Sequence, residues 1–118
     1  MGQEVEPTHV VGHLVAYARQ QHENLYRKAN MTDPIIKPTD DEGENERNGW
    51  EGRESTALLD MLTDGIAKAV DLLKDLPDIS WGRPGQHPED GRRSIRQHTV
   101  RMAAHFDEHI AQLEAMRP

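Results

Sequence analysis

Apolar residues recur at intervals of three and four along three segments of the chain, the spacing that places side chains on one face of an α-helix. In residues 8–30 this pattern predicts an amphipathic helix of about six turns, which ends near Asn30 because Pro34 disfavours its continuation. Its apolar face comprises Val10, Leu14, Tyr17, Ala18, Gln21 and Leu25.

The second segment, residues 55–76, has the broadest apolar face in the chain and contains no histidine. We therefore expect a helix whose role is packing, with Ser55 as its N-cap. The face comprises Leu58, Leu59, Leu62, Ile66, Ala69, Val70, Leu73 and Leu76.

The third helical segment begins either near Pro88 or at Ser94 and extends to residue 117. Ser94 is followed three residues later by Gln97, which matches the capping-box pattern of a helix N-terminus. The expected inward face comprises Ile95, His98, Met102, His105, Phe106, His109, Leu113 and Met116.

Two connections separate these helices, residues 31–54 and residues 77–93, and both are rich in proline and glycine. The first also carries a dense run of carboxylates in residues 40–46, which favours a solvated crossover loop because the stepped spacing of a calcium loop is missing. A chain of 118 residues is expected to form a single domain, 1–118. The predicted fold is all-α, an up-down bundle of three long helices with a long crossover loop.

Composition excludes several classes of function. The formal net charge of −7 argues against a nucleic-acid partner, whose phosphates require a basic surface. The absence of cysteine excludes disulfides, thiolate ligands and a cysteine nucleophile. No apolar run of about 18 residues is present and the N-terminal residues are acidic, so we expect no membrane segment, no signal peptide and a cytoplasmic location.

The candidate chemistry lies in histidines. His105 and His109 are four residues apart, so on a helix they lie one turn apart on the same face, and Gln112 lies close to the same line. His13 on the first helix is the expected third ligand of a shared metal ion, with His9 as its alternative. Three neutral imidazoles leave coordination positions open, as in catalytic rather than structural metal sites.

The other histidines have different expectations. His98 is about 10 Å along the axis from His105, too far to share an ion with it, and is expected in the core or as a gate. His22 and His87 are expected on the surface or in a loop. A weaker alternative uses both four-apart pairs, His9 with His13 and His105 with His109, for a four-histidine or two-metal site.

Two stretches resemble the DinB-like family of small metal-binding four-helix bundles. They are His13-Leu14-Val15-Ala16 and the HxxxHxxQ pattern within residues 105–113. The resemblance spans roughly residues 8–117 and implies His13, His105 and His109 as ligands of one divalent metal, commonly zinc or nickel. The family includes thiol-dependent S-transferases and mycothiol-dependent maleylpyruvate isomerases. Its first helix, which should precede His13, is missing here, so we expect either that a second copy of the chain closes the bundle as a homodimer or that the sequence is a degenerate relative of the family.

These observations support two classes of function. The first is a metal-dependent S-transferase or isomerase, whose partners are a low-molecular-weight thiol and a small electrophile. In it Glu108 orients a histidine N–H and Gln112 hydrogen-bonds the reacting groups. A metal-dependent hydrolase is a less favoured variant. The second is a non-catalytic dimeric helical protein for binding or stress response, whose histidines are vestigial or sense metal or pH.

Overall fold

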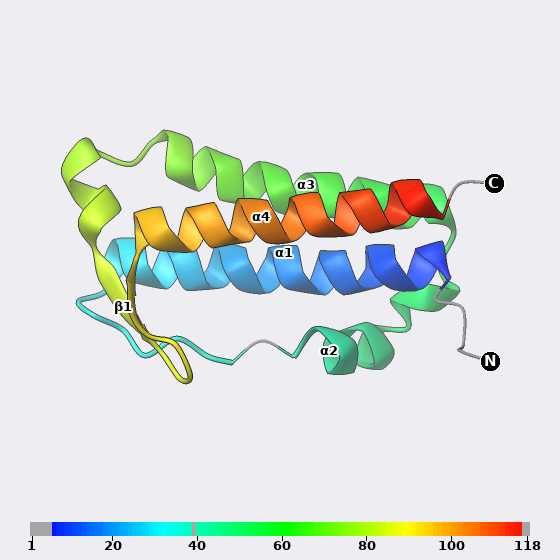
Figure 1. The fold of residues 1–118 in the computed structure, drawn as a ribbon, viewed down its shortest axis with the longest axis horizontal. Helices are drawn as coiled ribbons and strands as arrows, with labels where there is room; N and C mark the ends of the chain where they lie inside the picture. The colour runs from blue at the N-terminus through cyan, green and yellow to red at the C-terminus, as the bar shows by residue number, and fades with distance from the viewer. Residues whose placement is uncertain (1–5, 39, 117–118) are drawn as a thin grey trace.

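The computed structural model describes residues 6–38 and 40–116, except for the side chain of residue 51. Three long helices, α1 (Pro7–Asn30), α3 (Ser55–Lys74) and α4 (Ile95–Ala115), form an elongated bundle (Figure 1). The predicted all-α bundle of three long helices with a long crossover is thus confirmed. The crossover returns the chain to the end where α1 begins, so α1 and α3 run parallel and α4 runs antiparallel to both. Residue 117, the expected end of the last helix, lies outside the described residues.

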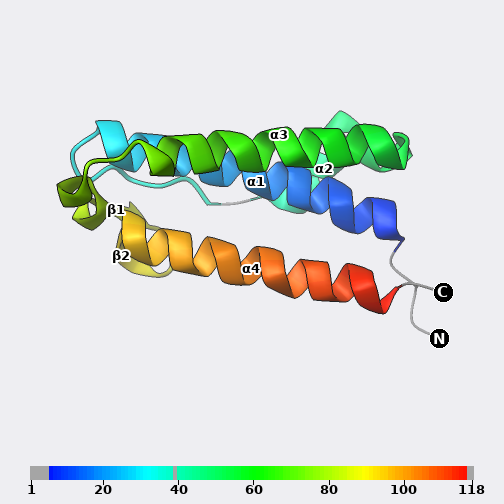
Figure 2. The ribbon, with the colours of Figure 1, turned by 90° about the horizontal axis from the view of Figure 1, so that it is seen from above.

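Helix α1 is the centre of the bundle and contacts both α3 and α4, which diverge from each other in the second view (Figure 2). Two apolar clusters follow its length. One joins Val11, Val15 and Ala16 to Trp50 and Leu58, and the other joins Leu25 to Ala69, Leu73, Ile95 and Met102. Because α1 is apolar on two sides, it can be covered by two helices at once.

The helix starts show one confirmed and one wrong expectation. Ser94 caps α4 through the predicted capping box, with its side chain accepting from the Gln97 backbone N–H and the Gln97 side chain accepting from the Ser94 backbone N–H. Ser55, however, is the first residue within α3 and not its cap. Glu54 occupies that position without a side-chain hydrogen bond, and its carbonyl accepts from the N–H of Leu58.

The expectation of a structureless crossover over residues 31–54 was wrong in its second half. There the acidic run forms a short helix, α2 (Asp41–Asn48), followed by the 3-10 helix η1 (Trp50–Gly52). Asp40 caps α2 by accepting from the N–H of Gly43, and the carboxylates of the first turn lie at the positive end of the helix dipole. The left-handed conformation of Gly49, with φ of 61°, ends the helix.

Helix α2 lies against α1 because residue 12 has no side chain. A Cβ on Gly12 would lie 2.5 Å from Oδ1 of Asn45, which is only 2% exposed. Trp50, equally buried, then inserts into the apolar cluster between α1 and α3. The crossover is therefore held against α1 along its acidic helix.

The second connection, expected as loop 77–93, contains the 3-10 helix η2 (Asp78–Gly82) and a hairpin of β1 (Pro84–His87) and β2 (Gly91–Ser94). The strands pair antiparallel from Pro84 with Ser94 to His87 with Gly91, and Gly91 has the positive φ of 78° that the turn requires. A parallel bridge from Ile35 to Gln86 attaches the crossover to this hairpin. The period-based expectation missed the hairpin because its strands are four residues long and polar.

Candidate metal centre

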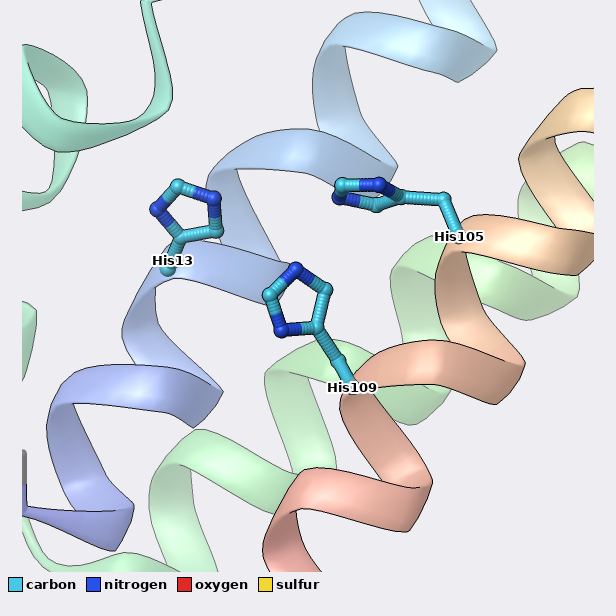
Figure 3. Close-up of side chains that lie close together, drawn as sticks. All are labelled: His13, His105 and His109. Carbon is cyan, nitrogen blue, oxygen red and sulfur yellow. The ribbon is translucent and has the colours of Figure 1, made fainter.

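Three imidazoles from two helices converge at one point of the bundle. His13 projects from α1, and His105 and His109 project from α4 (Figure 3). One potential ligand atom from each lies within 4.8 Å of the other two. The ring centroids are 4.5 Å apart for His105 and His109 and 5.5 Å apart for His13 and His109. The structure therefore brings together the three histidines that the sequence singled out.

Side-chain oxygens lie within hydrogen-bond distance of Nδ1 in two of these rings. Nδ1 of His13 lies 3.1 Å from Oε1 of Glu42, and Nδ1 of His109 lies 2.9 Å from Oε1 of Gln112. Since the Gln112 oxygen can only accept, Nδ1 of His109 carries the proton and its Nε2 keeps the lone pair, whereas His13 has a carboxylate oxygen beside each of its two nitrogens. A metal ligand needs that tautomer, with a second group holding the opposite nitrogen.

The third imidazole, of His105, is left with an unsatisfied atom. Its Nε2 is buried and has no hydrogen-bond partner among the described residues. Burial lowers the pKa of His105, and the neighbouring rings of His109 and His13 lower it further, so the ring stays neutral. A buried polar nitrogen without a partner is costly, and a bound cation would satisfy it. The donor set of three imidazole nitrogens fits a divalent ion such as zinc or nickel.

Asp41, on the short helix α2, closes the site from the side opposite α4. Its Oδ2 lies 3.2 Å from Nε2 of His13, and its Oδ1 is buried without a hydrogen-bond partner in the described part of the chain. Burial raises the pKa of Asp41, and the nearby carboxylates of Glu44 and Asp40 add to this, while His13 opposes it. Sequence reasoning missed Asp41 and Glu42, and the only signal was the density of carboxylates before and within this helix.

The remaining predicted residues take distinct places. His9 lies 3.0 Å from Glu42, outside the group of three, so His13 is the histidine of α1 that faces α4. Gln112 contacts an imidazole of the cluster, as described, whereas Glu108 is exposed on α4 and its charge acts weakly to raise the pKa of His105. His22 is half-buried on α1.

A second group of polar side chains lies further along the bundle. His98 is buried, and both it and His87 receive hydrogen bonds from Nζ of Lys28, each 2.8 Å long. The position of His98 in the core agrees with the expectation for it. His87, expected in a loop or on the surface, instead lies half-buried in strand β1, because the hairpin folds over the end of α1. A Cβ on Gly85 would lie 2.8 Å from Cε of Lys28, so the strand can pass this closely only with glycine there.

A pocket of about 490 Å³ connects the two groups. Tyr17, Asp41 and His105 line it at the end next to the metal candidate, and His87 and His98 line it at the other end. The Tyr17 ring lies 4.1 Å from that of His105, and burial followed by the charge of Asp41 raises the pKa of Tyr17 to about 12. The phenol therefore remains a hydrogen-bond donor at neutral pH. Pockets of this size accommodate small molecules.

Comparison with known proteins decides the family. The family model of the DinB superfamily matches residues 7–113, which is most of the chain. The chain belongs to the DinB superfamily. This DinB-superfamily chain has no match among curated proteins or among solved structures. Across the described ranges, its helices are too short or too polar for any of them to cross a membrane.

Proposed function

We propose that this DinB-superfamily protein is a metal-dependent S-transferase or isomerase that activates a small thiol at His13, His105 and His109. The observation that carries the proposal is the convergence of three imidazoles, one with a buried unpartnered nitrogen, at the end of a small-molecule pocket. We propose the cytoplasm as its location, where low-molecular-weight thiols are kept reduced.

The chain's own residues divide the work of such a reaction. His13, His105 and His109 would hold a zinc or nickel ion, which when bound lowers the pKa of a coordinated thiol. Gln112 keeps the His109 imidazole in the ligating tautomer, and Glu42 lies beside Nδ1 of His13.

Two further groups, both lining the pocket, are proposed to transfer protons. Asp41, with its raised pKa and an unpartnered Oδ1, is placed to accept the thiol proton. The Tyr17 hydroxyl, still protonated, is placed to donate to the electrophile.

Elemental analysis and a conjugation assay test the proposal. We expect purified protein to take up one divalent ion per chain and, when loaded, to conjugate a small thiol to a model electrophile. His105→Ala and His109→Ala should lose both the ion and the activity, whereas His22→Ala, a half-buried histidine outside the cluster, should keep both. A wild-type chain that takes up no divalent ion overturns the proposal, and one that binds the ion without conjugating a thiol overturns its catalytic part.

A second candidate function is a dimeric binding module, and the surface of the bundle supports it. Leu59 and Val70 on α3 are 48% and 51% exposed, and Val100 and Ile110 on α4 are 65% and 49% exposed. These four side chains lie on two helices that diverge from each other, and a partner that covered both helices would bury them. We propose a second copy of the chain as the partner, whether or not the metal centre is catalytic.

A further inference from the structure

Lys28 is an unusual residue for the interior of a small protein. It is fully buried, and the described residues contain no carboxylate that pairs with it. Its Nζ instead donates to two imidazoles, reaching Nε2 of His87 and Nδ1 of His98. Burial lowers its pKa from 10.5 to about 8, with a smaller contribution from Arg93, so at neutral pH most of the population still carries the charge. A buried cation without a counterion is costly and calls for a compensating anion.

The buried ammonium also sets the direction of the hydrogen bonds around it. A lysine ammonium can only donate, so Nδ1 of His98 accepts and Nε2 of His98 carries the proton. That Nε2 donates to Oε1 of Gln21, which leaves the NH₂ group of the Gln21 amide as its free end. By the same reasoning Nε2 of His87 accepts, and its Nδ1–H becomes a donor.

Both imidazoles are held in these neutral forms. Burial, followed by the charge of Lys28, lowers the pKa of His98 to about 3 and that of His87 to about 4. Gln21, His87 and His98 all line the pocket, so its inner wall offers hydrogen-bond donors. Lys28 determines which of their atoms donate, because its ammonium occupies the accepting nitrogen of each imidazole.

The charges on the same wall indicate the class of ligand. The cations that line the pocket are Lys37, Arg93 and Arg101, and the anions are Asp41, Glu89 and Asp90. Lys28 behind the wall makes four cations against three anions, and Glu23, outside the pocket, offsets the difference by pairing with Lys37. Arg93 forms an ion pair with Asp90 at 3.0 Å, and Lys37 lies 3.8 Å from Glu23. Arg101 has no ion pair among the described residues, so its charge is available to a ligand.

We propose that this end of the pocket is a carboxylate-binding subsite, in which Gln21, His87 and Arg101 bind a carboxylate of a small molecule that extends to the metal candidate. A planar carboxylate matches the amide and guanidinium donors. His98 and His105 are seven residues apart on α4, so the carboxylate would lie about 10 Å from the reacting atom. Its assignment to the substrate rests on the proposed function, but carboxylate binding itself does not.

NMR titration of metal-free, isotope-labelled protein at neutral pH and fixed ionic strength tests the subsite. The probes are acetate, its neutral counterpart acetamide, and sulfate as a tetrahedral dianion. We expect saturable shifts of the Gln21 side-chain amide and of the His87 and His98 ring signals with acetate, none with acetamide, and weaker ones with sulfate. Equal responses to acetate and acetamide overturn the proposal, and tighter binding of sulfate overturns the carboxylate assignment.

Variants locate the binding. Arg101→Gln, at an exposed position of α4, should weaken acetate binding roughly tenfold, whereas Arg96→Gln, also exposed on α4 but outside this pocket, should not. Gln21→Glu keeps the shape but replaces the donor by an anion, and should abolish binding. If Arg101→Gln and Gln21→Glu both bind acetate like the wild-type chain, the subsite is refuted.

The subsite and the metal centre can fail separately. His105→Ala should lose metal uptake and keep acetate binding, while Arg101→Gln should do the reverse. Acetate binding in a wild-type chain that takes up no metal would leave the subsite standing and remove the proposed function. Metal-dependent conjugation without acetate binding would do the opposite.

Discussion

Gln112 accepts a hydrogen bond from His109 at 2.9 Å, three residues before it on α4, and thereby holds the imidazole in one tautomer. The amide is exposed, so its role is confined to this contact and it contributes little to packing. Gln112, near the C-terminal end of α4, thus acts on the candidate metal site through His109.

Gln112→Leu should therefore weaken metal binding with little effect on folding. Loss of such an orienting partner lowers metal affinity about 10- to 100-fold in other sites. Competition against a chromophoric chelator measures the affinity, with Glu114→Gln, an exposed neighbour on α4, as the control. Equal affinities for Gln112→Leu and the control would show that the hydrogen bond has no orienting role.

Gly12→Ala should displace α2 from α1. The new Cβ would lie 2.5 Å from Oδ1 of Asn45, so either the buried Asn45 side chain must rotate or the short helix that holds Asp41 and Glu42 against His13 must shift. We expect a loss of roughly 1–3 kcal/mol of unfolding free energy, together with weaker metal binding.

Gly52→Ala is the matched control for this change. A Cβ there has nothing within 4 Å, and the residue is exposed, so urea unfolding should be almost unchanged. A Gly12→Ala variant as stable as the control would mean that the contact between α1 and α2 is not required.

Metal binding should raise stability in a way that depends on the three histidines. A ligand that binds only the folded chain, present at 100 times its dissociation constant, adds about 2.7 kcal/mol to the unfolding free energy. Thermal unfolding with zinc and with excess chelator measures this difference for the wild-type chain and for His109→Ala. The variant should show no difference, and a stabilisation that persists in it would place the ion elsewhere.

Stability should fall as the pH drops below about 6.5. Burial lowers the pKa of His98 to about 3 and that of His87 to about 4, with the charge of Lys28 as the second cause, whereas an unfolded histidine has a pKa of 6.5. Between these values protons bind the unfolded chain preferentially, so the stabilisation present above pH 6.5 is lost as the pH approaches 3.

Lys28 predicts a second rise of stability with pH, in the alkaline range. Its folded pKa of about 8 lies below the value of 10.5 for an unfolded lysine, so the unfolded chain binds the proton more tightly and stability should rise from pH 8 toward pH 10. Urea unfolding from pH 3 to pH 10 measures the free energy of unfolding in both ranges. Lys28→Met should remove most of the rise in the alkaline range, called here the alkaline limb. An alkaline limb that is unchanged in Lys28→Met would assign it to another group.

The exposed apolar side chains of α3 and α4 predict self-association. Val70→Glu and Ile110→Glu should shift the mass measured by analytical ultracentrifugation from dimer to monomer, because each places a charge where an apolar contact is expected. Lys68→Glu, an exposed polar position of α3, is the control. A wild-type chain that is monomeric at high concentration would refute the homodimer.

Much of the fold could be predicted from periodicity. The apolar spacing predicted all three long helices, and Ser94 with Gln97 predicted the start of α4, because these signals are local and repeat over many turns. The short elements were missed. Helix α2 has two turns and almost no apolar residues, and the hairpin has four-residue strands, so neither contains enough of a period to detect.

The candidate metal site was likewise predictable from the sequence only in part. The interval between His105 and His109 determined by itself that the two rings lie on one face of a helix, whereas His13 was expected as the third member from its place on the first helix, with His9 as its alternative. Only the tertiary structure placed Asp41 beside His13, and Lys28 between His87 and His98, residues that are far apart in sequence. Helix periodicity acts over a few residues and can be read along the chain, whereas these contacts depend on how the crossover and the hairpin fold back onto α1, which no local spacing records.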